Sequence, residues 1–130
     1  MPNSYYQAHR YLNVLRAQNL TAPTAVYVGL FTTMPGRDGS GGVECTTGTH
    51  PGYARQVVKF DPPATGKIVN TAKATMIGST ASAWINLRGF GIWDAASGGN
   101  LLGYEAFPAV RSYGVGQEVA FAAGELQVEH

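Results

Sequence analysis

The residues best suited to chemistry in this sequence are Glu44, Cys45 and His50, which stand close together in one short stretch. A thiol, an imidazole and a carboxylate are the parts of a nucleophilic site, in which the base activates the thiol and the carboxylate orients the base. Such sites are held by rigid scaffolds, whereas this stretch has the composition of a flexible loop. We therefore predict that Cys45 is an incidental thiol and that the chain is not an enzyme.

Other combinations of polar residues are no stronger as catalytic or metal sites. A pair of carboxylates could support glycoside hydrolysis, but the candidates all stand at turns or strand ends, where acidic residues are ordinary: Asp61, Asp94, Glu105 and Glu118. The histidines have no second ligand at metal spacing: His9, His50 and His130. The run Gly39-Ser40-Gly41-Gly42 is not followed by the Lys-Ser or Lys-Thr pair of a phosphate-binding loop. The sequence thus predicts no metal and no cofactor.

Two tryptophans and one arginine raise the question of ligand binding. Trp84 and Trp93 could stack on sugar rings, but both lie in strongly apolar runs, which favours burial in a core or an interface. Arg55 stands between Tyr53 and Gln56, where it is expected to pair with a strand edge or a loop rather than to receive an anionic ligand.

Composition limits the classes of function. The chain has 130 residues, of which 45% are apolar and only 13% charged, so we expect one domain whose surface is covered in large part by other protein. A net charge of +1 with scattered basic residues argues against nucleic acid as a partner. No apolar run is long enough to span a membrane, and the N-terminus lacks the features of a signal peptide. With a single cysteine, the chain is expected to be made in a cytoplasm.

The first twenty residues predict an amphipathic helix. Asn3 or Ser4 can cap it, it is expected to end near Asn19, and apolar residues recur at helical spacing in the stripe Tyr5, Ala8, Leu12 and Leu15. Such a stripe packs on the rest of its own domain or docks on a neighbouring subunit. The helix over 1–20 is therefore part of the domain or docked on it.

Beyond residue 20 the pattern is that of short strands. Alternation predicts strands over 25–33 and 53–61, separated by a long loop over 34–52 that is rich in glycine and proline. Further short runs follow, bounded by turn residues, at 67–72, 74–78, 83–93, 100–106, 111–115, 118–122 and 125–129. Within them, the apolar flanks and small-residue loop of 89–104 predict a β-hairpin. The fold is predicted to be mainly β, with the helix preceding a single antiparallel β-sandwich or small barrel over 21–130.

Several motifs, taken in order, resemble a known family. The first are Ala22-Pro23, Val26-Tyr27-Val28-Gly29-Leu30-Phe31-Thr32-Thr33, Pro35 and Gly41-Gly42-Val43-Glu44. Later ones are Gly52-Tyr53-Ala54-Arg55-Gln56-Val57, Asn70-Thr71-Ala72, Trp84, the hairpin from Gly91 to Leu102, and Val115 through Phe121 to Leu126. Together they resemble small virion proteins of tailed bacteriophages, usually labelled tail fibre or minor tail protein.

The resemblance implies a β-sandwich structural protein of the virion, made in the cytoplasm of a bacterial host, without an active site. It would act through contacts with other virion proteins and copies of itself, as a tail, fibre-attachment, collar or capsid-decoration protein. The alternative is a receptor- or carbohydrate-binding module that presents the loop over 34–52 and one tryptophan to a host surface. The candidate partner-contact residues are Tyr5, Leu12, Leu15, Cys45, His50 and Trp93.

Overall fold

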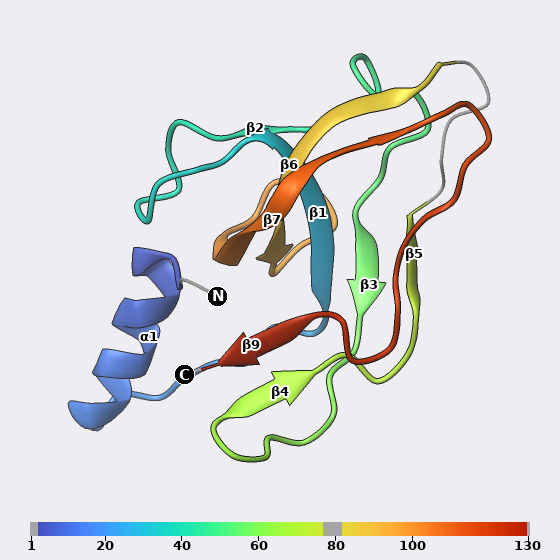
Figure 1. Ribbon diagram of the computed structural model, residues 1–130. Coiled ribbons are helices and arrows are strands. Elements are labelled where there is room, and N and C mark those ends of the chain that lie inside the picture. Colours follow the sequence, from blue (N-terminus) through green and yellow to red (C-terminus); the bar gives the residue numbers. More distant parts are fainter. Residues whose placement is uncertain (1–2, 77–81, 130) are drawn as a thin grey trace.

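The structure is a computed structural model that describes residues 3–76 and 82–129. Over these residues, one helix is followed by strands whose pairings are all antiparallel (Figure 1). The elements are α1 (Tyr5–Leu15), β1 (Val26–Thr33), β2 (Val43–Glu44), β3 (Gln56–Val58), β4 (Lys67–Val69), β5 (Ala74–Met76), β6 (Trp84–Trp93), β7 (Leu101–Tyr113), β8 (Val119–Phe121) and β9 (Gln127–Glu129). The predicted mainly β fold with one N-terminal helix is confirmed.

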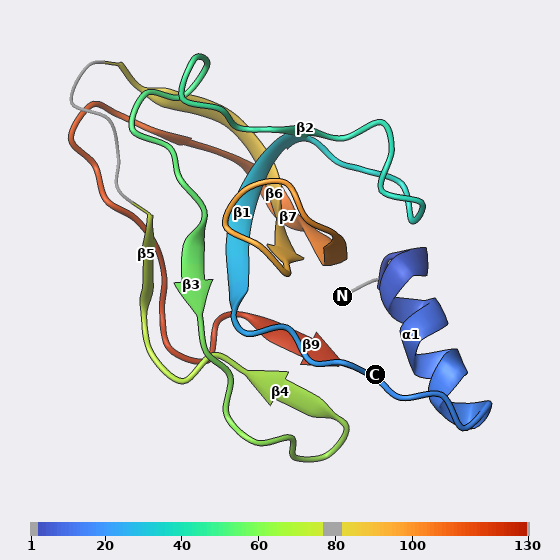
Figure 2. The ribbon, with the colours of Figure 1, turned by 180° about the vertical axis from the view of Figure 1, so that it is seen from behind.

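The main sheet has the strand order β2-β1-β6-β7. One edge of β1 pairs with β6, and its other edge is shared by β3 and β2. Two small sheets, β4-β9 and β5-β8, complete the body, and Figure 2 shows β4, β5 and β9 beside the main sheet. Phe90 of β6 meets Phe121 of β8 with ring centroids 5.4 Å apart, so the core lies between the main sheet and a small one. This arrangement is sandwich-like, and the described strands close no barrel.

The predicted hairpin is confirmed, because β6 and β7 pair through Gly91 and Tyr104 on either side of a turn over 94–100. However, β7 is one long strand and not the two runs predicted over 100–106 and 111–115. The residues between these runs include Pro108, which has no N–H to donate. The pairing with β6 shifts register there, so the proline costs no ladder hydrogen bond.

Most other strands are shorter than their apolar runs, and one was missed. The stretch 34–52, predicted to be loop, contains β2, whose pairing with β1 is continued by a 2.9 Å hydrogen bond from the Cys45 amide to the Leu30 carbonyl. β5 covers the first part of the run predicted over 74–78, and the rest of that run lies outside the described residues.

The helix starts where the sequence predicts and ends earlier. The Ser4 hydroxyl caps α1 by accepting a hydrogen bond from the Gln7 amide, 3.2 Å away. At the other end, Ala17 adopts a left-handed φ of 61°, and the Gln18 amide donates to the Asn13 carbonyl at 3.0 Å. This is the hydrogen bonding of a Schellman turn, usually made with glycine, and it ends the helix at Leu15 rather than near Asn19.

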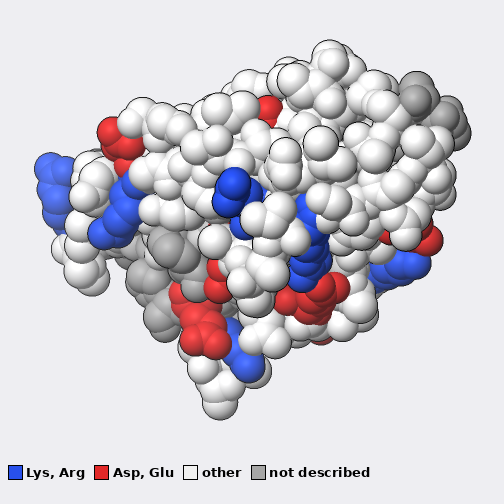
Figure 3. Space-filling model, turned by 45° about the horizontal axis from the view of Figure 1, so that its top comes forward, with Lys and Arg blue, Asp and Glu red and all other residues white. Residues whose placement is uncertain are grey.

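The surface carries few charges. Figure 3 shows one face on which basic and acidic side chains are scattered among a larger uncharged area. Within the described ranges, no helix has the length and apolar character needed to cross a membrane.

Candidate functional site

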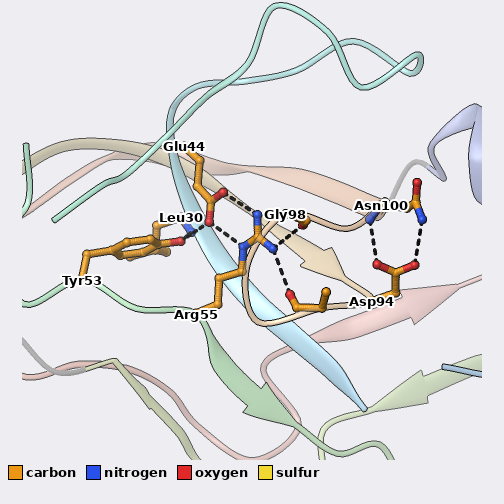
Figure 4. A network of polar contacts seen from close by, with 8 residues as sticks. Leu30, Glu44, Tyr53, Arg55, Asp94, Gly98 and Asn100 are labelled. Carbon is orange, nitrogen blue, oxygen red and sulfur yellow. Dashed lines mark hydrogen bonds and ion pairs between the residues drawn. The ribbon is translucent and has the colours of Figure 1, made fainter. Parts of the chain in front are cut away.

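Among the described residues, an extended polar arrangement surrounds Arg55, in the segment that leads into β3. Its guanidinium donates to both carboxylate oxygens of Glu44, at 2.8 and 2.7 Å, and to the carbonyls of Ala95 and Gly98, at 2.9 and 2.8 Å (Figure 4). Its Cζ atom also lies 3.8 Å from the centre of the Trp93 ring. The Arg55 side chain is only 7% exposed. Its hydrogen bonds join three parts of the chain: β2, the segment that leads into β3, and the turn between β6 and β7.

Tyr53 completes this arrangement, and we call Glu44, Tyr53, Arg55 and Trp93 the Arg55 cluster. The Tyr53 hydroxyl donates to Glu44 at 2.5 Å and accepts a hydrogen bond from the Leu30 amide at 3.2 Å. Burial, and next the hydrogen bond to the Glu44 carboxylate, raise the pKa of Tyr53 far above its usual value. The hydroxyl therefore stays protonated and acts as a fixed donor.

Gly29 of β1 lies directly beneath the cluster. A Cβ atom at this position would lie 2.8 Å from the Tyr53 hydroxyl oxygen and 2.9 Å from Glu44 Oε2, closer than such atoms approach one another. It would also lie 3.2 Å from Trp93 Nε1, a buried atom with no hydrogen-bond acceptor among the described residues. Glycine is thus required here to let the cluster close over the strand.

Glu44, Cys45 and His50, considered above as an orienting carboxylate, a nucleophile and a base, do not form a catalytic arrangement. The carboxylate of Glu44 is bound by Arg55 and Tyr53. The ring nitrogens of His50 lie 2.9 Å from Thr49 Oγ1 and 3.3 Å from the Ile85 carbonyl oxygen, so neither is left for Cys45. Burial, and next the charge of Glu44, raise the pKa of the Cys45 thiol to about 12. The thiol is consequently neutral and weakly nucleophilic near neutral pH.

Three of the acidic residues considered for glycoside hydrolysis have polar partners in the structure. Asp61 accepts a hydrogen bond from Thr71, and Glu118 pairs with Lys73 at 2.7 Å. Asp94 accepts from the amide and side chain of Asn100, at 2.7 and 3.0 Å, which closes the hairpin turn (Figure 4). Partial burial raises the pKa of Asp94, but these hydrogen bonds outweigh it and hold the pKa below the ordinary value. In the described part of the chain, no three His, Cys, Asp or Glu residues are grouped so that they could hold a metal ion.

The six candidate partner-contact residues fall into two groups. Cys45 and His50 are buried inside the chain, and Trp93 is half-buried beneath Arg55. Tyr5, Leu12 and Leu15 are exposed on α1, and Tyr5 stacks on His9 beneath the guanidinium of Arg37. The structure therefore gathers only the three helix residues on one surface.

The helix stands at the side of the body with no buried residue (Figures 1 and 2). A groove of about 280 Å³ separates it from the sheets, and α1 lines this groove with Gln7, Arg10 and Tyr11. Hydrogen bonds run from Arg10 to Gln7 and from Gln7 to Tyr11, at 2.7 and 2.8 Å. The polar side of the helix thus faces the body, while Leu12 and Leu15 point into solvent, with exposures of 57% and 84%.

Comparison with protein families identifies the chain. A model of the family described as Podophage GP4 fiber I protein gp80 matches residues 2–129. The chain belongs to this family. No curated protein matches it. The expected resemblance to phage tail fibre proteins is thereby confirmed.

In this member of the fiber I family, the sequence predicts the apolar helix face but not the Arg55 cluster. The predicted pairing of Arg55 with a strand edge or a loop is confirmed, but the sequence does not identify its partner. Glu44, Tyr53 and Arg55 all lie in motifs that resemble phage proteins, and this was the available signal. Their spacing alone does not indicate that they contact one another. The carbonyls that complete the site cannot be inferred from it either, because they belong to a turn some forty residues later.

Proposed function

We propose that this protein is a non-enzymatic structural component of a tailed-phage virion, held in place by contacts between α1 and neighbouring protein. Membership of a phage fibre family supports the virion role. The observation that carries the docking role is the orientation of α1, whose apolar side faces solvent and whose polar side faces the body. An amphipathic helix that packs only on its own domain has the opposite orientation.

The distribution of exposed apolar side chains supports the same surface. Of the eleven large apolar residues that are exposed in the described part of the chain, six precede residue 21; Tyr5, Leu12 and Leu15 lie on the outer side of α1, whereas Leu20 lines the groove. Removing such side chains from water contributes about 1.5–3 kcal/mol each when burial is complete. Burial of the outer side of α1 would therefore stabilise association. The other exposed apolar residues are spread over separate strands and loops.

Carbohydrate or receptor binding has less support. The face of the Trp93 ring is covered by the Arg55 guanidinium, and Trp84 is 1% exposed with its indole N–H donating to the Pro51 carbonyl at 2.9 Å. A stacking platform for sugars needs an aromatic face that is open to solvent. We place synthesis in the cytoplasm of the bacterial host, followed by incorporation into the particle.

The test is incorporation into particles. Phage would be produced with Leu12→Gln and Leu15→Gln together, and the amount of this protein in purified virions measured by quantitative mass spectrometry. Glutamine keeps helix propensity while removing the apolar surface. We expect at least a hundredfold loss, because two leucine burials of about 1.5–3 kcal/mol each are removed.

Val115→Gln is the matched control, since Val115 has the same 57% exposure as Leu12 but lies far from α1 in the sequence. It should be incorporated as the unaltered protein is. Normal incorporation of a folded double variant would contradict the docking role of α1.

A further inference from the structure

The exposed side of α1 has an apolar middle and a positive charge at each end. Four exposed residues lie along one line of the helix, because they follow one another at intervals of four, three and four residues: Tyr5, His9, Leu12 and Arg16. Arg37, from the loop between β1 and β2, lies beside the first of them. We infer that this line and Arg37 form a docking surface for another virion protein, one that offers an apolar slot with a carboxylate at each end. The inference rests on the docking role of α1 in the proposed function and adds the chemistry of the partner.

The end of this surface at Arg37 is held in place within the chain. The Arg37 guanidinium carbon lies 4.7 Å from the centre of the Tyr5 ring, which stacks on His9 with ring centroids 6.0 Å apart. The Arg37 carbonyl accepts a hydrogen bond from the Tyr5 amide at 2.7 Å, and Arg37 Nε donates to the Asn3 carbonyl at 3.1 Å. Figure 1 shows the loop between β1 and β2 near the first turn of α1. Because the exposed cation and the aromatic ring are already positioned, docking costs less conformational entropy.

The other end of the surface is Arg16, the residue that directly follows α1. Because a helix rises about 1.5 Å per residue, Arg16 lies about 16 Å from Tyr5 along the axis. Its guanidinium donates to the Asn13 side chain at 3.0 Å, and this neutral amide leaves the positive charge uncompensated. Leu12 lies between the two cations with an exposure of 57%. A partner that covers Leu12 therefore brings its own groups against Arg16 and Arg37, and carboxylates bind guanidinium groups through two parallel hydrogen bonds.

The carboxylates of this chain are largely engaged, which favours a different protein over a second copy. Of its eight acidic side chains, six form ion pairs or accept hydrogen bonds within the chain: Asp38, Glu44, Asp61, Asp94, Glu118 and Glu125. Glu129 lies opposite Lys67 where β9 pairs with β4. In the described part of the chain, the ion pairs do not include Arg16 or Arg37. A second copy therefore has few carboxylates that could bind these arginines without losing a contact of its own.

The position of the charges on the helix also favours a protein over a lipid surface. A helix that lies in a membrane interface carries its basic residues on the face opposite its apolar residues. On α1, Arg16 and His9 are in line with Leu12, so burial of Leu12 in lipid would bring both toward the hydrocarbon. An apolar slot flanked by discrete carboxylates matches such a mixed surface.

Cross-linking in purified virions tests the inferred carboxylate. Arg16→Lys keeps the positive charge and supplies an amine, which a water-soluble carbodiimide couples to a carboxylate in direct contact, with loss of water, to form an amide. We expect mass spectrometry to find such amides between position 16 and an Asp or Glu of another virion protein. Arg88→Lys, at an exposed position on β6, is the matched control and should give no link to that protein. Links only to a second copy of this chain, or no link in particles that contain the variant, would overturn the inference.

Reversal of the charge gives a second test with a quantitative readout. Arg16→Glu places like charges opposite each other at the contact, so we expect the amount of this protein in purified virions to fall at least about tenfold. Arg88→Glu should be incorporated as the unaltered protein is. Replacement of the cross-linked carboxylate of the partner by arginine should restore incorporation of the Arg16→Glu variant, which a general loss of helix stability would not allow.

The outcomes separate the acidic partner from the docking role of α1. If Arg16→Glu enters particles normally while Leu12→Gln with Leu15→Gln does not, α1 docks through its leucines alone and the acidic partner is wrong. The acidic partner is also wrong if the purified chain floats with vesicles of phosphatidylglycerol and phosphatidylethanolamine and Arg16→Glu prevents it, because the charge would then serve a lipid surface. Normal incorporation of the leucine variant would contradict the proposed function and the inference together.

Discussion

The Arg55 cluster pairs its buried charged groups within the chain, whereas α1 leaves its apolar side chains exposed to solvent. At the cluster, a guanidinium that is 7% exposed meets a carboxylate, two carbonyls and an indole ring, so every charge taken from water has a partner in the same chain. On α1, the polar side chains are matched while Leu12 and Leu15 remain in solvent. The body is therefore complete as a single chain and the helix is not. Changes at the first region should act on stability, and changes at the second on association.

The sharpest test of this contrast is Arg55→Ala. It leaves Glu44 partly buried with its ion pair broken and removes the donors to the Ala95 and Gly98 carbonyls. Breaking a buried pair from one side typically costs about 3–5 kcal/mol, so we expect a loss of about 4 kcal/mol in the free energy of unfolding measured by urea denaturation.

Arg111→Ala is the control for that substitution. Arg111 lies 3.8 Å from Glu125, its side chain is 34% exposed, and pairs of this kind contribute about 1 kcal/mol or less. Equal losses for the two arginines would mean that the Arg55 cluster is no more than a surface contact.

Gly29→Ala should have the next largest effect. The added Cβ would push against Tyr53 and Glu44, and overpacking of this kind costs about 2 kcal/mol. In a chain that already carries Tyr53→Phe, the same substitution should cost less, because one of the two close oxygens is gone.

Gly48→Ala is the matched control for the glycine, since the nearest atom its Cβ would meet is Thr46 Oγ1, at an ordinary 3.7 Å. It should leave the urea midpoint nearly unchanged. If Gly48→Ala and Gly29→Ala lower the midpoint equally, backbone freedom and not the cluster explains the glycine at position 29.

Cys45 lies next to Glu44 of the cluster, and its thiol should make stability depend on alkaline pH. Its pKa is raised from 9.0 to about 12 in the folded chain, so the folded state disfavours the thiolate. Stability from this group is present below pH 9 and is lost as pH rises toward 12, where the unfolded chain releases the proton and the folded chain does not. Unfolding monitored between pH 8 and pH 11 should show a shallower decline for Cys45→Ala. Identical slopes would mean that Cys45 does not contribute to the alkaline loss.

The fold was largely predictable because it rests on local patterns. Alternation and turn residues indicated the hairpin of β6 and β7, and helical spacing indicated α1. The burial of Cys45 and His50 was not foreseen, because a stretch rich in glycine and threonine has the composition of an exposed loop. Two residues of β2 are enough to attach that stretch to β1, and so short a strand has no periodicity to detect.

The orientation of α1 relative to the body also cannot be predicted from the sequence. An apolar stripe indicates that one side of a helix packs against something, but it does not indicate whether that neighbour is the same chain or another subunit. The sequence therefore leaves both possibilities open. The orientation depends on hydrogen bonds from Ser4 and Arg10 to carbonyls at 101 and 21, which no helical pattern encodes. The Arg55 cluster depends in the same way on a distant turn.

The smallest effect on stability is expected from the apolar side of α1. Leu12→Gln with Leu15→Gln should change the free energy of unfolding of the dilute chain by no more than about 0.5 kcal/mol, because neither leucine is removed from water when the single chain folds. Glutamine has nearly the helix propensity of leucine, so α1 itself should persist. The measurement is urea denaturation at a concentration where sedimentation shows monomers. A loss comparable to that of Gly29→Ala would mean that α1 supports the body through its leucines, and the division between a self-sufficient body and an association helix would not hold. With stability unchanged, a failure to associate or to enter particles can only be assigned to the surface that those leucines present.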